Sequence, residues 1–136
     1  MIQQLILEKL KDKLDNSYSP YSKFKVSSAL KISGSDDLIY GVNVENVSFG
    51  ATICAERSAL VQWISQREDK QALIEVVYVM ADSSPLVKPC GMCLQMLSEF
   101  CSTNTQVVCS DVHFKTKEFS WDELFPQPFS SESLKV

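Results

Sequence analysis

The sequence lacks a long hydrophobic run and a cluster of basic residues, and it contains a single histidine. No apolar stretch approaches the roughly 18 residues that a membrane-spanning helix needs, so we expect no association with a membrane. The 13 lysines and arginines are scattered, and the formal net charge is −4. A nucleic-acid-binding protein usually shows a basic patch or stripe, which is missing here. The sequence therefore disfavours membrane proteins and proteins that bind nucleic acid.

The N-terminus also lacks the order of a signal peptide, in which a basic segment precedes an apolar one. Charges are instead spaced along MIQQLILEKL, and we therefore expect a cytoplasmic protein. The chain has five cysteines, an odd number. In a reducing compartment, these are better explained as metal ligands, reactive thiols or core residues than as disulfides.

The spacing of apolar residues predicts both helices and strands. Apolar residues three and four apart predict helices over 2–14, 53–66 and about 91–101. Runs rich in β-branched residues predict strands over 24–32, 38–44 and 72–81, followed by QVVCS and VHFKTKEF. The segment SGSDD favours an antiparallel hairpin of the first two strands, and WDELF favours a short helical turn.

Length and element order together define the expected architecture. A chain of 136 residues with 45% hydrophobic residues fits one globular domain. Strands and helices alternate along its middle, which predicts an α/β fold, a three-layer α/β/α sandwich with a mixed central sheet of about five strands. The tail PQPFSSESLKV has little regular structure in this interpretation.

Three cysteines lie at the starts of two predicted helices. Cys90 and Cys93 form a Cys-x-x-Cys pair, and Cys54 opens the helix over 53–66. The unpaired N–H groups and the positive dipole end of a helix N-terminus favour thiolates. Three thiolates predict a zinc site whose fourth position stays open to water, as in catalytic rather than structural zinc sites.

Two charged residues follow Cys54. Arg57 lies three residues further along the same helical face, so its guanidinium can reach the sulfur and withdraw charge from a zinc–thiolate centre. Glu56 is not explained by spacing, because residues two apart on a regular helix point to nearly opposite faces. Only a deviation in the first turn, or a cleft around the helix start, would aim Glu56 at the metal.

Each of these features has a simpler explanation when it is taken alone. A Cys-x-x-Cys pair can be a redox pair or two buried thiols, and Cys54 alone is better explained as a core cysteine. The pair Glu56 and Arg57 is more often part of a solvated helix face. The combination is more specific, because a Cys-Ala-Glu segment followed by Pro-Cys-x-x-Cys is typical of zinc nucleobase deaminases.

With these motifs in this order, the sequence resembles the small, homotetrameric cytidine deaminases. The resemblance rests on four segments in the same order, SPYSKFKVSSAL, GVNVENVSFGATICAERSAL, PCGMCLQML and ELFPQPF. It implies a single cytidine deaminase-like domain over 1–136, with a C-terminal tail from about residue 126 that contacts a neighbouring subunit. It also implies a homotetramer with shared active sites.

The resemblance implies specific roles for the residues of the thiol motifs. Cys54, Cys90 and Cys93 would bind one Zn²⁺ per chain. Glu56 would be the catalytic proton shuttle, carrying a proton from zinc-bound water to N3 of cytosine and then to the departing amino group. The implied reaction converts cytidine and deoxycytidine to uridine and deoxyuridine with release of ammonia, in pyrimidine salvage.

The resemblance also implies a set of substrate-binding residues. Asn43 and Glu45 would hold the ribose, Phe24 would pack against the pyrimidine, and the backbone N–H of Ala55 would donate to the base carbonyl. Phe129 would reach into the site of a neighbouring subunit. Without the resemblance, Asn43 and Glu45 would be taken as solvated polar residues, and Phe129 as a clamp of the tail onto its own domain.

The chain departs from the family pattern at four positions. Leu94 stands where the family usually has arginine, which leaves Arg57 alone to compensate the thiolate charge. Phe49 stands where a tyrosine usually reaches the nucleoside of an adjacent subunit, so the ring is kept and the hydroxyl is lost. Ser27 and Ser28 replace small Gly or Ala residues. These departures bear on affinity and substrate breadth more than on activity.

The remaining candidates receive simpler interpretations. Cys101 and Cys109 are expected to be core thiols, and His113 is not expected to be a ligand. Two other functions stay open, namely a deaminase of another aminated nucleoside and a zinc-stabilised module without catalysis. Glu56 argues against the second, because a structural zinc site normally closes with a fourth protein ligand.

Overall fold

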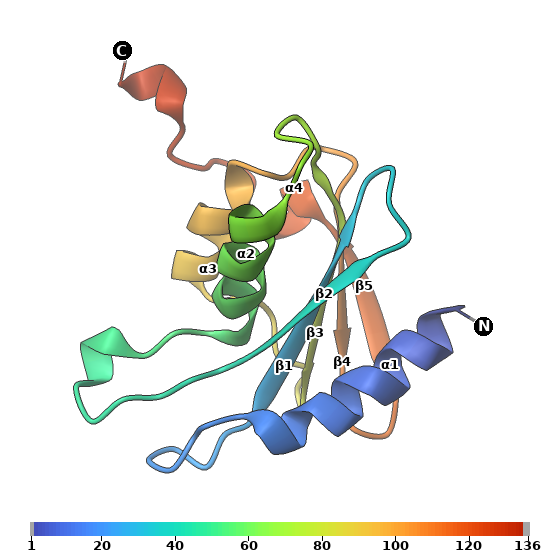
Figure 1. The fold of residues 1–136 in the computed structure, drawn as a ribbon, viewed down its shortest axis with the longest axis vertical. Coiled ribbons are helices and arrows are strands. Elements are labelled where there is room, and N and C mark those ends of the chain that lie inside the picture. Colours follow the sequence, from blue (N-terminus) through green and yellow to red (C-terminus); the bar gives the residue numbers. More distant parts are fainter. Residues whose placement is uncertain (1, 135–136) are drawn as a thin grey trace.

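The computed structural model describes residues 2–134. Within these residues, five strands form one sheet in the order β2-β1-β3-β4-β5 (Figure 1). The strands, in chain order, are β1 (Val26–Ile32), β2 (Leu38–Val42), β3 (Ile74–Ala81), β4 (Gln106–Ser110) and β5 (Thr116–Ser120). Strands β3 and β4 are parallel, and the other neighbouring pairs are antiparallel. The predicted mixed sheet and the antiparallel first pair are confirmed.

Helices cover both faces of the sheet (Figure 1). Helix α1 (Ile2–Lys13) lies on one face, and helices α2 (Ala55–Gln66) and α3 (Gly91–Ser98) lie on the other. A short helix, α4 (Trp121–Leu124), follows β5 and begins with a capping box between Ser120 and Glu123. The three-layer α/β/α arrangement predicted from the sequence is therefore confirmed.

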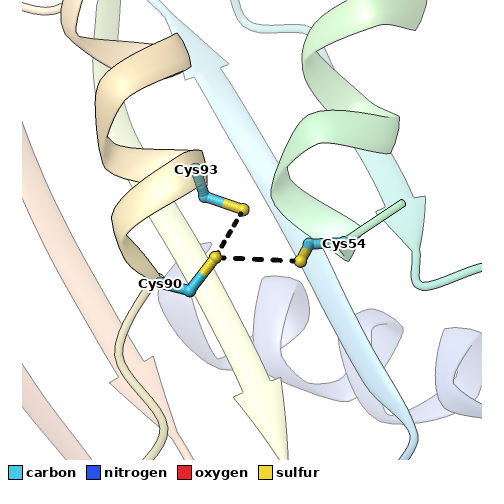
Figure 2. Close-up of side chains that lie close together, drawn as sticks. All are labelled: Cys54, Cys90 and Cys93. Atoms are coloured by element: carbon cyan, nitrogen blue, oxygen red, sulfur yellow. Dashed lines mark hydrogen bonds between the residues drawn. The ribbon is translucent and has the colours of Figure 1, made fainter. Parts of the chain in front are cut away.

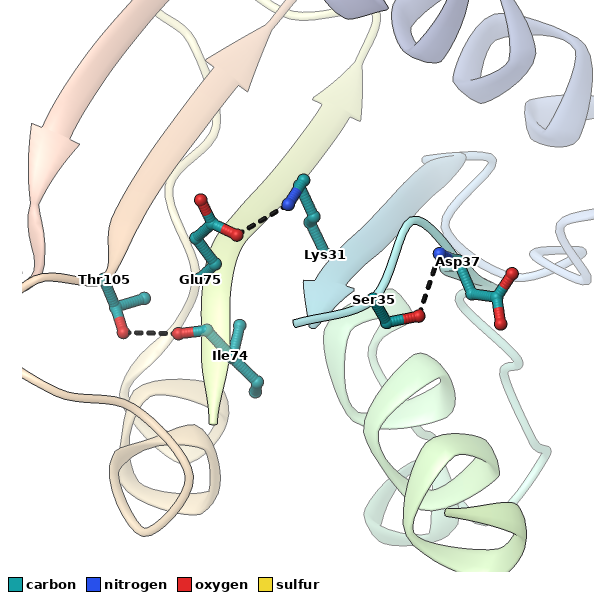
Figure 3. A network of polar contacts seen from close by, with 6 residues as sticks. All are labelled: Lys31, Ser35, Asp37, Ile74, Glu75 and Thr105. Carbon is teal, nitrogen blue, oxygen red and sulfur yellow. Dashed lines mark hydrogen bonds and ion pairs between the residues drawn. The ribbon is translucent and has the colours of Figure 1, made fainter. Parts of the chain in front are cut away.

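The central strand β3 shows why the sheet is buried on both faces. Val77 and Val79 lie in the cluster under α2 and α3, whereas Tyr78 and Met80 lie in the cluster under α1. Alternate side chains of a strand point to opposite faces, so a nearly continuous apolar run supplies both cores. The exposed Glu75 interrupts this run and pairs with Lys31 of β1 at an N–O distance of 2.6 Å (Figure 3).

A glycine sets how closely α2 approaches the sheet. A Cβ atom on Gly41 of β2 would lie 2.4 Å from the backbone N of Ala59 and 2.6 Å from the backbone O of Ala55. These atoms belong to the helix backbone and cannot rotate away. Because Ala55 is the first residue of α2, the glycine fixes the depth at which the start of the helix, with Cys54 and Glu56, rests on the sheet.

Several elements are shorter than the sequence predicts. The helix predicted from residue 53 begins at Ala55, because Cys54 has an extended backbone with ψ 159° and acts as the N-cap. The strand predicted over 38–44 ends at Val42, and Val44 makes only isolated bridges to neighbouring segments. The segment VHFKTKEF contributes only its second half to β5, since Phe114 has a φ of 67° and forms a turn.

Other boundaries shift by a few residues. Strand β1 begins two residues late, β3 begins at Ile74 rather than 72, and α3 ends at Ser98 rather than about 101. The tail carries one 3₁₀ turn, Ser131–Ser133. Among residues 2–134, no helix combines the length and the apolar character needed to cross a bilayer.

Candidate metal centre and active site

Three thiols converge between the starts of α2 and α3. The Sγ atoms of Cys54 and Cys90 lie 3.9 Å apart, and those of Cys90 and Cys93 lie 3.6 Å apart (Figure 2). All three sulfurs lie within 4.8 Å of one another. Cys54 is the N-cap of α2 and Cys90 is the N-cap of α3, while Cys93 lies in the first turn of α3. Both helix N-termini therefore direct their positive dipole ends at the cluster.

The spacing of the sulfurs fits one tetrahedral metal ion. With zinc–sulfur bonds of about 2.3 Å, tetrahedral geometry places two sulfur ligands roughly 3.8 Å apart. The distances of 3.6 and 3.9 Å lie on either side of this value. A disulfide would bring two sulfurs to about 2.0 Å, and all three cysteines are free. Cys54, Cys90 and Cys93 can thus hold one metal ion and leave a fourth position open.

A hydrogen bond between two of the thiols favours the thiolate form of Cys54. A hydrogen bond from the Cys93 thiol lowers the pKa of Cys54 to about 5, and Arg57 adds to this effect. The same hydrogen bond raises the pKa of Cys93 above its usual range. Thiolates are the form in which cysteine binds metals.

Arg57 supplies positive charge beside the cluster. Its Nη2 atom donates to the backbone O of Thr52 at 3.2 Å and lies 3.9 Å from the sulfur of Cys54. Burial alone lowers the pKa of Arg57, but the hydrogen bond to Cys54 and the nearby thiolate charge raise it overall. Leu94 of α3 packs into the core cluster, so the position where the resemblance implies a second arginine contributes packing instead.

Glu56 is the buried carboxyl group of the site. Only 4% of its surface is exposed, and burial raises its pKa to about 7, with the charge of Cys54 adding to the increase. Hydrogen bonds to its own backbone N–H and to the Cys93 thiol act in the opposite direction. Because Cys54 lies outside the helix with an extended backbone, the opposite-face geometry of a regular helix does not apply. Glu56 therefore lies beside the cluster, although the spacing of a regular helix would place it on the opposite face from Cys54.

Asn43 is more constrained than a solvated residue at a strand end. It is buried, and its Oδ1 atom accepts hydrogen bonds from the Ser17 hydroxyl at 2.5 Å and from the backbone N of Val26 at 3.0 Å. Its Nδ2 atom donates to the backbone O of Phe24 at 2.8 Å. Within residues 2–134, one N–H of this amide has no partner, because the NH₂ group carries two donors and makes one bond.

Glu45 is held by the loop that precedes β1. Its Oε1 atom accepts from the backbone N of Tyr21 at 3.0 Å and of Ser22 at 3.1 Å, and its Oε2 atom accepts from the Ser22 hydroxyl. The hydroxyl bond is the largest cause of the lowered pKa of Glu45. The sequence did not single out Ser17 and Ser22; the only signal was a serine-rich loop, DNSYSPYS.

The three phenylalanines assigned to substrate binding all keep exposed rings. Phe24 is 40%, Phe49 is 74% and Phe129 is 60% exposed. The ring of Phe49 meets Tyr21 edge-on at a centroid distance of 5.9 Å. The backbone O of Phe129 accepts a hydrogen bond from Gln95 of α3 at 3.0 Å, so this part of the tail lies along α3.

The other singled-out residues lie in structural positions. Ala55 is fully buried, and its N–H belongs to the first helical turn, which has no carbonyl partner within its own helix. Cys109 is buried in β4, and Cys101 is partly buried against the same core. His113 is exposed in the turn after β4, apart from the thiol cluster.

The two serines of β1 are buried but satisfied. The hydroxyl of Ser27 donates to the backbone O of Leu10 at 2.8 Å, and that of Ser28 donates to the backbone O of Tyr78 at 2.7 Å. Because both hydroxyls have partners, their burial carries little penalty. These departures from Gly or Ala tie β1 to α1 and to β3.

Comparisons with known proteins agree with this site. A family model described as "Cytidine and deoxycytidylate deaminase zinc-binding region" matches residues 2–110. A cytidine deaminase of Mycoplasma pneumoniae is 37% identical over 124 residues, 90% of this chain and 90% of the relative. A cytidine deaminase of Halalkalibacterium halodurans is 34% identical over 135 residues, 98% of each chain. The crystal structure of a cytidine deaminase from Burkholderia pseudomallei aligns with a TM-score of 0.83 at 30% identity, covering 95% of this chain and 100% of the other.

The fold and the cluster define a class of α/β/α sandwich proteins in which three thiols at two helix starts form a zinc-binding centre. Within that class, the chain belongs to the cytidine and deoxycytidylate deaminase zinc-binding family.

Proposed function

We propose that this chain is a zinc-dependent enzyme that deaminates cytidine and deoxycytidine hydrolytically, giving uridine and deoxyuridine with release of ammonia. The observation that carries this proposal is the buried carboxyl group of Glu56 beside three sulfurs spaced for one metal ion. The family membership and the names of the relatives support it. A structural zinc site would normally provide a fourth protein ligand.

In this proposal Cys54, Cys90 and Cys93 hold the zinc ion, which when bound supplies the Lewis acidity that activates water at neutral pH. Glu56 moves the protons: it accepts one from the attacking water, delivers it to N3 of the cytosine ring and assists the departure of the amino group as ammonia. Its burial keeps bulk water away from the proton path. Arg57 offsets the negative charge of the thiolates, which otherwise weakens the metal as a Lewis acid.

The remaining site residues orient the nucleoside. The free amide N–H of Asn43 and the remaining lone pair of Glu45 bind the ribose hydroxyls. Phe24 packs against the pyrimidine, and the N–H of Ala55 donates to the base carbonyl. A substrate held at both its sugar and its base is presented to the metal in one orientation, which lowers the entropic part of the barrier.

The substitution Glu56→Gln tests this function. We expect the variant to keep about one zinc per chain and to lose cytidine turnover by at least about 100-fold, because glutamine cannot carry a proton. Zinc is measured by elemental analysis, and turnover by ultraviolet absorbance and ammonia release. Glu68→Gln, at an exposed position after α2, is the control and should retain wild-type turnover. A wild type that binds zinc but releases ammonia only from another aminated nucleoside identifies the alternative substrate, and one that releases none from any nucleoside indicates a structural module.

We also propose that 1–136 forms a single cytoplasmic domain that assembles into a homotetramer with shared active sites. The exposed rings of Phe49 and Phe129 support this assembly, since a neighbouring subunit would bury them. The absence of disulfides among the cysteines, all of which are described, favours a reducing compartment. The molar mass in solution should be about four times that of one chain, and a stable, active monomer would refute the assembly.

A further inference from the structure

The hydroxyl of Ser22 joins two residues that the proposed function places on different parts of the substrate. It donates to Oε2 of Glu45 and accepts a hydrogen bond from the backbone N of Phe24 at 3.0 Å. A serine hydroxyl has one hydrogen to donate and two lone pairs to accept with, so both bonds form at the same time. The sugar-binding carboxylate and the backbone of the base-packing residue therefore share one partner.

Both backbone polar groups of Phe24 make hydrogen bonds to the proposed sugar-binding residues or to Ser22, which binds one of them. Its N–H donates to Ser22, and its carbonyl accepts from Nδ2 of Asn43 at 2.8 Å. Phe24 as a residue is 40% exposed, so packing does not enclose its side chain completely. These two backbone bonds hold the position from which the side chain of Phe24 projects.

The carboxylate of Glu45 depends on the same hydroxyl. Two backbone N–H groups bind Oε1, and Ser22 Oγ provides the hydrogen bond to Oε2. A carboxylate has about four lone-pair sites, so one remains for a substrate hydroxyl. Without the Ser22 hydroxyl, Oε2 loses the bond that aims this last site.

We propose that Ser22 is a positioning residue for substrate binding: its hydroxyl fixes Glu45 and Phe24 relative to each other, so that the sugar and base contacts form as one unit. The proposal rests on the proposed function, because the roles of Glu45 and Phe24 are taken from it. Ser22 acts through these residues and does not itself contact the reacting atoms.

The substitution Ser22→Ala removes both bonds and tests the proposal. We expect the KM and the dissociation constant of cytidine to rise about three- to tenfold, since one hydrogen bond contributes roughly that factor. The kcat should change less than KM. The inhibition constant of 2′,3′-dideoxycytidine, which keeps the 5′-hydroxyl but lacks the 2′- and 3′-hydroxyls, should rise less than the dissociation constant of cytidine. Ser22→Thr keeps the hydroxyl at a solvent-exposed position and should restore the wild-type values.

Ser35 provides a matched control at another turn (Figure 3). Its Oγ atom accepts from the backbone N of Asp37, two residues ahead, at 3.0 Å, the same local bond that Ser22 makes to Phe24. Ser35 is partly exposed, whereas Ser22 is exposed, and the hairpin that contains Ser35 lies at the other end of β1. Ser35→Ala should leave cytidine binding unchanged, which separates loss of a local turn bond from loss of the link to Glu45.

The outcomes distinguish this proposal from the proposed function. An unchanged cytidine dissociation constant in Ser22→Ala overturns the positioning role, and so does an equal rise for cytidine and the dideoxy analogue. A wild type that binds cytidine without releasing ammonia contradicts the proposed reaction alone, because the binding comparison still tests Ser22. A wild type that does not bind cytidine overturns both.

Discussion

Replacing Gly41 with alanine is expected to displace the start of α2 and to weaken the metal centre. The new Cβ atom would lie 2.4 Å from the backbone N of Ala59 and 2.6 Å from the backbone O of Ala55, whereas ordinary contacts begin near 3.4 Å. Relief of both contacts requires a movement of about 1 Å between β2 and α2. Cys54 and Glu56 flank Ala55, so they move with the helix start.

The size of the effect follows from the atoms involved. Overpacking a core usually costs about 1–3 kcal/mol, and the upper end applies here because backbone atoms cannot change rotamer. For a chain of 136 residues, a loss of about 3 kcal/mol lowers the melting temperature by roughly 10 °C. A movement of about 1 Å is also large compared with the tolerance of a metal–ligand bond, so zinc affinity should fall.

Thermal unfolding of the zinc-loaded protein and competition with a chromophoric chelator measure the two effects. Gly50→Ala is the control, because a Cβ atom at Gly50 meets nothing within 4 Å and its φ is not positive. The control should melt within about 2 °C of the wild type. If Gly41→Ala melts at the wild-type temperature and holds zinc equally well, the close packing of α2 on β2 does not position the site.

Three further predictions concern the rest of the fold. Leu10→Ala should cost about 2–5 kcal/mol in the free energy of unfolding, because Leu10 lies on the buried face of α1 and is fully buried. Leu5→Ala, at a position of the same helix that is 67% exposed, should cost under about 0.5 kcal/mol. Denaturant titration measures both. Lys31→Ala removes a partly exposed ion pair with Glu75 and should change that free energy by less than about 1 kcal/mol, so a larger loss would contradict the assignment of a weak surface pair. Burial raises the pKa of Cys109 to about 11, so at pH 8 only about one thiol in 1000 is ionised; mass spectrometry after alkylation should find it unlabelled in the folded protein and labelled in denaturant.

The sheet and its helices could be predicted because their signals are local. The β-branched run of β3 and the apolar spacing of α2 each identify an element within about a dozen residues. The ends of elements are less predictable, since they depend on single backbone angles such as ψ of Cys54 and φ of Phe114. Neither angle can be derived from residue type alone.

In the candidate site, too, the residues of local motifs could be predicted, whereas contacts between distant segments could not. The thiol motifs identify Cys54, Cys90 and Cys93, because thiolates are common zinc ligands and a helix start favours the thiolate form. The partners of Glu45 could not be derived, since Ser22 lies 23 residues earlier and only the fold brings the two together. The place of Glu56 likewise depends on the cap geometry of α2, which spacing does not encode.

Zinc K-edge X-ray absorption of the purified, zinc-loaded protein measures whether Cys54, Cys90 and Cys93 share one zinc ion. We predict about three sulfur scatterers at about 2.3 Å and one oxygen or nitrogen scatterer at about 2.0 Å, as expected for three thiolates and one open position. A shell of four sulfurs would close the metal and remove the place where water must bind. A shell without sulfur would show that Cys54, Cys90 and Cys93 do not hold the ion, which contradicts a catalytic zinc centre at the starts of α2 and α3.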